Sequence, residues 1–248
     1  MTNRPLMAGN WKMYKTPSET RAFFEKFLPA VAAVNGRDIV ICPPSVNLPA
    51  AVDAAANSNV EIGGQNLFWE TKDGAYTGEI SGRMLKEAGA RWVIVGHSER
   101  RQYFHETDDT VYKRTCAALD AGLDPIVCVG ELLQEREEGR TNWVLETQFA
   151  HGIAKLTPEQ FAKIAIAYEP VWAIGTGKTA TPEIAAEAHR FIRGQANSKY
   201  GTNDVRILYG GSVKPDNIKG LMAQDEIDGV LVGGASLDPA SFAAIVNF

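Results

Sequence analysis

Residues 164–172 have the sequence Ile-Ala-Ile-Ala-Tyr-Glu-Pro-Val-Trp, in which an unbroken apolar run leads directly to one acid. An apolar run without alternation is typical of a strand that is buried on both faces of a parallel sheet. Seven further short runs of this kind lie at 6–9, 39–42, 60–63, 92–96, 125–129, 205–209 and 229–233. Together they predict eight parallel strands.

The segments between these runs carry helix-start signals. Thr16-Pro17-Ser18-Glu19 combines a capping residue, a first-turn proline and an acid three residues after the cap. Thr157-Pro158, Thr181-Pro182 and Asp238-Pro239 carry similar signals. Eight alternations of strand and helix without a linker predict one α/β domain over residues 1–248, and favour a closed (β/α)8 barrel over an open doubly wound sheet. Catalytic side chains are then expected directly after the strands.

The composition narrows the classes of function. With 25 basic and 30 acidic residues, the net charge is -5, which argues against a partner that is nucleic acid or an anionic membrane. The three cysteines have no C-x-x-C spacing, and after His105-Glu106 the second histidine position of a zinc motif holds Asp109. We therefore expect neither a disulfide framework nor a metal site. The N-terminal residues lack the apolar stretch of a signal peptide, so we expect a cytoplasmic location.

Two candidate site residues follow the first and fourth runs. Lys12, after Gly9-Asn10-Trp11, would supply a cation for a substrate anion or an oxyanion, although a surface salt bridge or a Schiff-base role stays open. His97 is the one histidine of four that directly follows a run. If a helix starts at Ser98, its N–H groups would disfavour the imidazolium and keep His97 neutral. Glu99 would balance Lys12 or form a simple surface pair.

The acid that ends the sixth run is a candidate general base. Glu169 follows a fully apolar strand and precedes Pro170-Val171-Trp172, so an ionised carboxylate is costly there unless it is used or paired. Partial burial is expected to raise its pKa towards the working pH. The alternative is a buried structural carboxylate paired with an arginine.

Glycines after the last two runs indicate a phosphate site. Gly210-Gly211-Ser212 follows the seventh run and Gly233-Gly234 the eighth, the two strands after which barrels often bind phosphate. Residues 173–180 fit only a relaxed dinucleotide pattern, placed too far from its strand. We therefore expect a glycine-hinged lid there instead of a cofactor loop.

The connection at 65–79 is long and has no helical periodicity. It carries Leu67, Phe68, Trp69 and Tyr76 among glycines and polar residues. Apolar residues on an exposed loop favour docking against another chain, while packing onto its own barrel is the alternative.

These stretches together closely resemble the triosephosphate isomerase family. The matching segments, in the family's order over nearly the whole chain, are Asn10-Trp11-Lys12, 97–101, 167–177, 209–212 and 232–235. Gly64 and Tyr76 are mild departures outside the chemistry. The resemblance implies a TIM barrel that interconverts dihydroxyacetone phosphate and D-glyceraldehyde 3-phosphate through an enediolate, in glycolysis and gluconeogenesis, with no metal or organic cofactor.

The resemblance also implies a role for each site residue. Glu169 would remove and return the proton beside the carbonyl, and neutral His97 would polarise the carbonyl as the electrophile. Lys12 and Asn10 would assist with the oxyanion, and Glu99 would support the site. The residues expected to hold the substrate are Asn10, Lys12, Gly175, Ser212, Gly233 and Gly234, under a lid at 170–180.

The family is also a homodimer in which the loop after the third strand inserts beside the partner's active site. This implies that Thr77 lies near the partner's Asn10 and the partner's His97. Two rival interpretations remain. Another phosphate-binding barrel isomerase or lyase would not need His97 and Glu169 together, and a catalytically silent barrel would have lost Lys12, His97 or Glu169.

Overall fold

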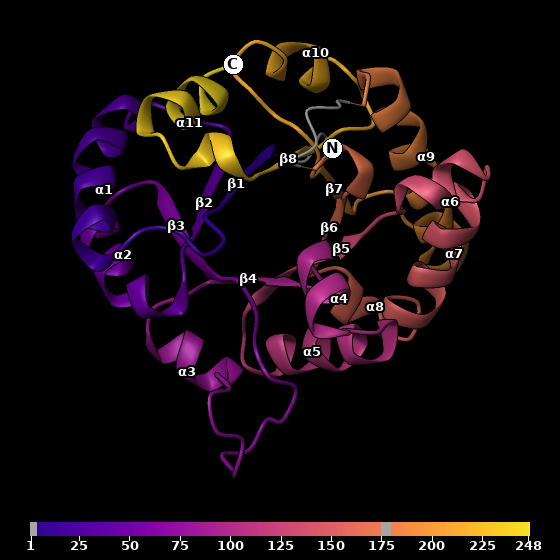
Figure 1. Ribbon diagram of the computed structural model, residues 1–248, viewed down its shortest axis with the longest axis horizontal. Coiled ribbons are helices and arrows are strands. Elements are labelled where there is room, and N and C mark those ends of the chain that lie inside the picture. Colours follow the sequence, from indigo (N-terminus) through magenta and orange to yellow (C-terminus); the bar gives the residue numbers. More distant parts are fainter. Residues whose placement is uncertain (1–3, 175–179) are drawn as a thin grey trace.

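The computed structural model describes residues 4–174 and 180–248. Residues 1–3 and 175–179, which include Gly175 and the middle of the expected lid, lie outside the described residues. In the described part, eight parallel strands close into a barrel in sequence order, and helices surround it (Figure 1). This arrangement confirms the predicted (β/α)8 barrel.

The strands coincide with the apolar runs to within one residue at each end. They are β1 (Leu6–Asn10), β2 (Asp38–Cys42), β3 (Val60–Gly64), β4 (Trp92–Val95), β5 (Asp124–Val129), β6 (Ala165–Tyr168), β7 (Arg206–Tyr209) and β8 (Gly229–Val232). The barrel closes where Leu6 of β1 pairs with Gly229 of β8. A Cβ at Gly229 would lie 2.1 Å from the Leu6 carbonyl oxygen, so the closing position requires glycine.

Helices fill the segments between the strands, and each of the four capping signals marks the start of one. They are α1 (Pro17–Val31), α2 (Leu48–Ala55), α3 (Gly82–Glu87), α4 (Ser98–Phe104), α5 (Asp108–Asp120), α6 (Leu133–Glu137), α7 (Thr141–Gly152), α8 (Pro158–Phe161), α9 (Pro182–Tyr200), α10 (Ile218–Met222) and α11 (Pro239–Val246), with 3-10 turns η1 (Ser45–Asn47), η2 (Val171–Ala173) and η3 (Gly234–Ser236). Four of them, α1, α8, α9 and α11, start at the prolines singled out above. In each case the preceding Thr or Asp accepts a backbone N–H from the first turn.

Two separate clusters of buried apolar side chains stabilise the barrel. The larger one lies between the strands and the helix ring. The smaller one fills the interior with side chains from the strands, namely Leu6, Ala8, Val40, Cys42, Trp92, Ile94, Ile126, Cys128, Ala165, Ala167, Leu208 and Leu231. Because the interior is filled, a substrate has room only at the ends of the strands.

The 65–79 loop between β3 and α3 extends beyond the helix ring, at the lower edge of Figure 1. Its base packs into the chain's own core through Leu67, which is 1% exposed. Its outer part holds a small aromatic cluster, in which the Phe68 ring lies 4.3 Å from Trp69 and 4.7 Å from Tyr76. None of the helices in the described residues combines the length and the hydropathy that a membrane span needs.

Candidate active site

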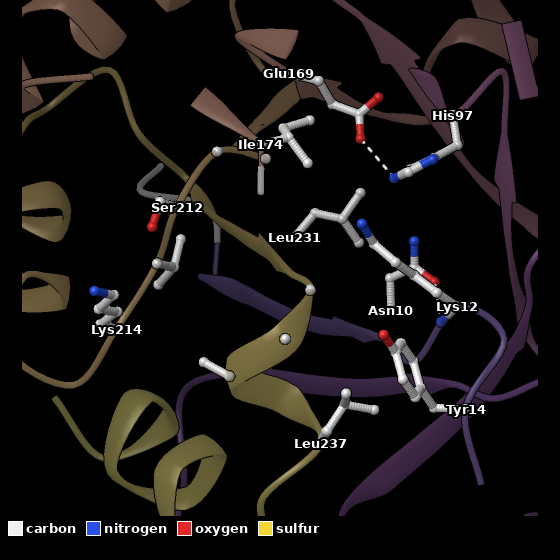
Figure 2. A pocket seen from close by; sticks show the side chains of 16 residues that line it. Asn10, Lys12, Tyr14, His97, Glu169, Ile174, Ser212, Lys214, Leu231 and Leu237 are labelled. Carbon is white, nitrogen blue, oxygen red and sulfur yellow. Dashed lines mark hydrogen bonds and ion pairs between the residues drawn. The ribbon is translucent and has the colours of Figure 1, made fainter. Parts of the chain in front are cut away.

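Glu169 and His97 meet at the carboxyl end of the barrel. Glu169 directly follows β6, its backbone N–H donates to the Val129 carbonyl at 2.8 Å, and its side chain is almost fully buried. One carboxylate oxygen lies 2.9 Å from His97 Nε2 (Figure 2). The other oxygen accepts the Ser98 backbone N–H at 2.8 Å. Within the described ranges, no arginine lies at ion-pair distance from Glu169, so the alternative of an arginine-paired structural carboxylate finds no support.

The orientation of the imidazole is set by the helix that follows it. His97 caps α4, and its Nδ1 accepts the backbone N–H of Glu99 at 3.2 Å. The helix start expected at Ser98 is therefore confirmed. Because Nδ1 is used as an acceptor, the proton of the neutral ring lies on Nε2, which donates to Glu169.

The contact between these two groups changes both of their pKa values. Burial acts to raise the pKa of Glu169, but the His97 imidazole and the Ser98 N–H outweigh it and hold that pKa below its ordinary value. Burial acts to lower the pKa of His97, and the nearby Glu169 and Glu99 carboxylates raise it overall, so in this arrangement the pKa moves opposite to the direction expected from the helix start alone. The expectation of a raised Glu169 pKa is thus wrong for this arrangement, because the contact with His97 outweighs the effect of burial.

Lys12 reaches the same end of the barrel from an unusual backbone conformation. Its φ is +52°, a left-handed value that costs a non-glycine residue about 1–2 kcal/mol. The turn is held by Asn10 Oδ1, which accepts the Lys12 N–H at 3.0 Å, and by Gln65 Nε2, which donates to the Lys12 carbonyl at 2.9 Å. The ammonium lies 2.6 Å from Glu99 Oε1, which confirms the expected pairing.

The glycine pairs line the same pocket as these side chains. This pocket has a volume of about 370 Å³, and its lining includes Asn10, Lys12, His97, Glu169, Ser212, Gly233 and Gly234. Ser212 lies opposite His97 in Figure 2, whereas a Cβ at Gly233 would lie 3.4 Å from Lys12 Cε. Gly175, the remaining expected phosphate ligand, lies outside the described residues. A Cβ at Gly210 would lie 2.9 Å from Glu169 Cγ, so this glycine makes room for the carboxylate itself.

Sequence reasoning missed several residues around the site. Gln65, which the sequence marks only as the start of a loop, holds the Lys12 carbonyl. Four further residues line the pocket, namely Tyr14, Ile174, Leu231 and Lys214. Glu131 is fully buried, and its Oε1 accepts the Tyr168 hydroxyl at 3.1 Å and Trp172 Nε1 at 2.9 Å. The signal that singled out Glu169, an acid just after an apolar strand, also exists at Glu131 after Gly130.

No group of three or more His, Cys, Asp or Glu side chains in the described residues is arranged to hold a metal ion. The titratable side chains that meet around Lys12 in this pocket are a carboxylate, an imidazole and an ammonium. Set at the strand ends of a (β/α)8 barrel, they define a class of barrel enzymes that move protons at a small carbonyl compound.

Comparison with known proteins agrees with this class and narrows it. The family model described as triosephosphate isomerase matches residues 5–248. A triosephosphate isomerase from Solibacter usitatus is 68% identical over 248 residues, 99% of each chain, and one from Moorella thermoacetica is 55% identical over 247 residues, 99% of this chain and 98% of the relative. The crystal structure of triosephosphate isomerase from Bartonella henselae superposes with a TM-score of 0.88 at 40% identity, covering 98% of this chain and 97% of that one. The chain belongs to the triosephosphate isomerase family.

Proposed function

We propose that this protein interconverts dihydroxyacetone phosphate and D-glyceraldehyde 3-phosphate, an aldose–ketose isomerisation of glycolysis and gluconeogenesis. The observation that carries the proposal is the 2.9 Å contact between Glu169 and His97 in a pocket that is also lined by Ser212, Gly233 and Gly234. A rival barrel isomerase or lyase would share the glycines but would not need this acid–base pair.

Substrate binding would separate the two groups that now touch. The carbonyl oxygen of dihydroxyacetone phosphate faces the Nε2 proton of His97 and the Lys12 ammonium, while Glu169 faces the neighbouring carbon. Once Glu169 loses its contact with His97, burial dominates and raises its pKa, which suits a general base.

Glu169 and His97 together carry out all the proton transfers of the reaction. Glu169 takes a proton from the carbon beside the carbonyl, and the electron pair moves onto the oxygen to form an enediolate. His97 donates its Nε2 hydrogen to this oxygen and recovers a proton from the neighbouring hydroxyl. Glu169 returns its proton to the adjacent carbon, which completes the isomerisation. Lys12 and Asn10 stabilise the oxyanion, and Glu99 holds the lysine.

The phosphate group would anchor the substrate at Ser212, Gly233, Gly234 and Gly175. An enediolate next to a phosphate ester eliminates phosphate easily, so the site must exclude water during the reaction. We assign that task to the segment 170–180. No cofactor takes part in this scheme.

The protein is further proposed to act as one barrel domain over 1–248, as a homodimer, in the cytoplasm. A second pocket of about 490 Å³ next to the site is lined by Met13, Gly78, His97 and Phe104. Met13 is 94% and Phe104 63% exposed, which is unusual for such large apolar side chains unless another chain covers them. The pocket therefore suits the partner's 65–79 loop.

The three free thiols agree with the proposed location in the cytoplasm, which is a reducing compartment.

A coupled assay of glyceraldehyde 3-phosphate isomerisation tests the proposal. Glu169→Gln keeps the shape but removes the base, so kcat should fall by about 10²–10⁴-fold. Glu159→Gln, an exposed position at the start of α8, is the matched control and should leave kcat unchanged. Equal turnover in wild type and Glu169→Gln would exclude this base, and no turnover in wild type would favour a catalytically silent barrel.

A further inference from the structure

The pocket has a lysine on each side, and the two differ in their partners. Lys12 shares its charge with Glu99, whose Oε1 lies 2.6 Å from the ammonium. Lys214 lies beside Ser212 on the opposite side of the pocket (Figure 2). Over residues 4–174 and 180–248, no carboxylate lies within ion-pair distance of the Lys214 ammonium.

The backbone of Lys214 is tied to that of Ser212 by one side chain. Asn217 Oδ1 accepts the Lys214 backbone N–H at 2.8 Å, and Asn217 Nδ2 donates to the Ser212 carbonyl at 3.0 Å. Val213 between them is buried, with 4% of its surface exposed. The lysine is therefore attached at a fixed place next to the expected phosphate-binding hydroxyl.

The charges of the pocket leave a phosphate dianion without a full counterion. A phosphate monoester carries about -1.5 to -2 at pH 7. Its expected ligands, the Ser212 hydroxyl and the N–H groups of Gly233 and Gly234, are neutral. Glu169 adds a negative charge to the same pocket, and Glu99 offsets Lys12. Among the described lining residues, Lys214 is the cation whose charge is not offset.

From this balance we propose that Lys214 is a specificity residue, which favours association and binding of the phosphorylated substrate through its charge. This inference rests on the proposed function and assigns no chemical step to the lysine. A cation at the mouth of a pocket raises the local concentration of an anionic ligand, and salt screens this effect.

The test compares wild type with Lys214→Met. At low ionic strength, kcat/KM for glyceraldehyde 3-phosphate should fall by about 3- to 10-fold while kcat changes little, and the gap should shrink at about 0.5 M salt. Turnover of D-glyceraldehyde, which has no phosphate, should be equal in both proteins. The dissociation constant of inorganic phosphate, measured by calorimetry without any turnover, should rise by a similar factor.

Two variants control for charge and for structure. Lys219→Met removes the same charge from an exposed position on α10 that does not line the pocket, and should behave as wild type. Lys214→Arg should retain the wild-type salt dependence. Equal phosphate affinity in wild type and Lys214→Met, or an equal loss with D-glyceraldehyde, would overturn the inference. If wild type binds phosphate but turns over no triose phosphate, the proposed function fails instead.

Discussion

Gly210 shows how a residue without a side chain can control the catalytic one. A Cβ at this position would lie 2.9 Å from Glu169 Cγ and 3.2 Å from the Tyr168 carbonyl oxygen. We expect Gly210→Ala to displace the Glu169 carboxylate, to lower kcat by about 10-fold or more, and to destabilise the fold by about 1–3 kcal/mol. Steady-state kinetics and denaturant unfolding measure the two effects.

The matched control for this substitution is Gly194→Ala. Gly194 lies in α9, and a Cβ there would meet no atom within 4 Å. Alanine should therefore stabilise the helix by roughly 0.5–1 kcal/mol and leave kcat unchanged. If both glycine variants lost activity equally, the steric account of Gly210 would be wrong.

The His97–Glu169 contact predicts a pH-dependent stability. The Glu169 pKa is lowered from 4.5, so its stabilising contribution exists above pH 4.5 and is lost as the pH falls through the folded-state pKa. The His97 pKa is raised from 6.5, so its contribution is complete below pH 6.5 and is lost as the pH rises through the folded-state pKa. Both contributions coexist between these two values.

The measurement is the difference in unfolding free energy between wild type and His97→Gln as a function of pH. We expect this difference to be largest between pH 4.5 and 6.5 and to decrease above that window. His151→Gln, on the exposed end of α7, shows what the loss of any surface imidazole does. A His97→Gln difference that keeps the same size from the window to well above pH 6.5 would refute the coupling.

At the scale of elements, strand positions were predictable because each apolar run has to be buried on both faces. The rule that site residues follow strands then located His97 and Glu169. What it could not provide was their mutual contact, since distance across the barrel mouth depends on how β4 and β6 are arranged. The reversed pKa of Glu169 and the contribution of Gln65 both arise from such contacts.

The capping signal of α1 makes a second prediction at this scale. The Thr16 side chain accepts the Glu19 N–H, and the Glu19 carboxylate accepts the Thr16 N–H at 2.7 Å. Thr16→Ala should lower the unfolding free energy by about 1 kcal/mol, because the first turn loses its cap. The helix packs through Phe23, Phe24 and Phe27, which lie in the turns after the cap and keep their contacts, so kcat/KM should not change. Thr16→Ser, which keeps the hydroxyl, should restore most of the stability.

At the scale of the whole molecule, the chain exposes a surface that a lone barrel does not need. The 65–79 loop extends from the ring of helices (Figure 1), and Tyr76 at its outer part is 44% exposed. Tyr103 at the end of α4 is 65% exposed. The loop's length and aromatic content were visible in the sequence. The sequence left open whether the loop packs on its own barrel or docks on another chain. In the structure Leu67 packs inside the chain's own core, while Tyr76 is exposed.

Thr77, which the family resemblance places near the partner's active site, provides the test of the proposed homodimer. An unpaired charge buried in an interface typically costs on the order of 2–5 kcal/mol, or roughly 30- to 5000-fold in the dissociation constant. Thr77→Arg should therefore sediment as a monomer and retain only weak activity, because the second pocket beside His97 would lose the loop that fills it. Ser198→Arg adds the same charge to an exposed site on α9 and should remain a fully active dimer. A Thr77→Arg protein that is a fully active dimer would show that the loop tip does not dock on a partner.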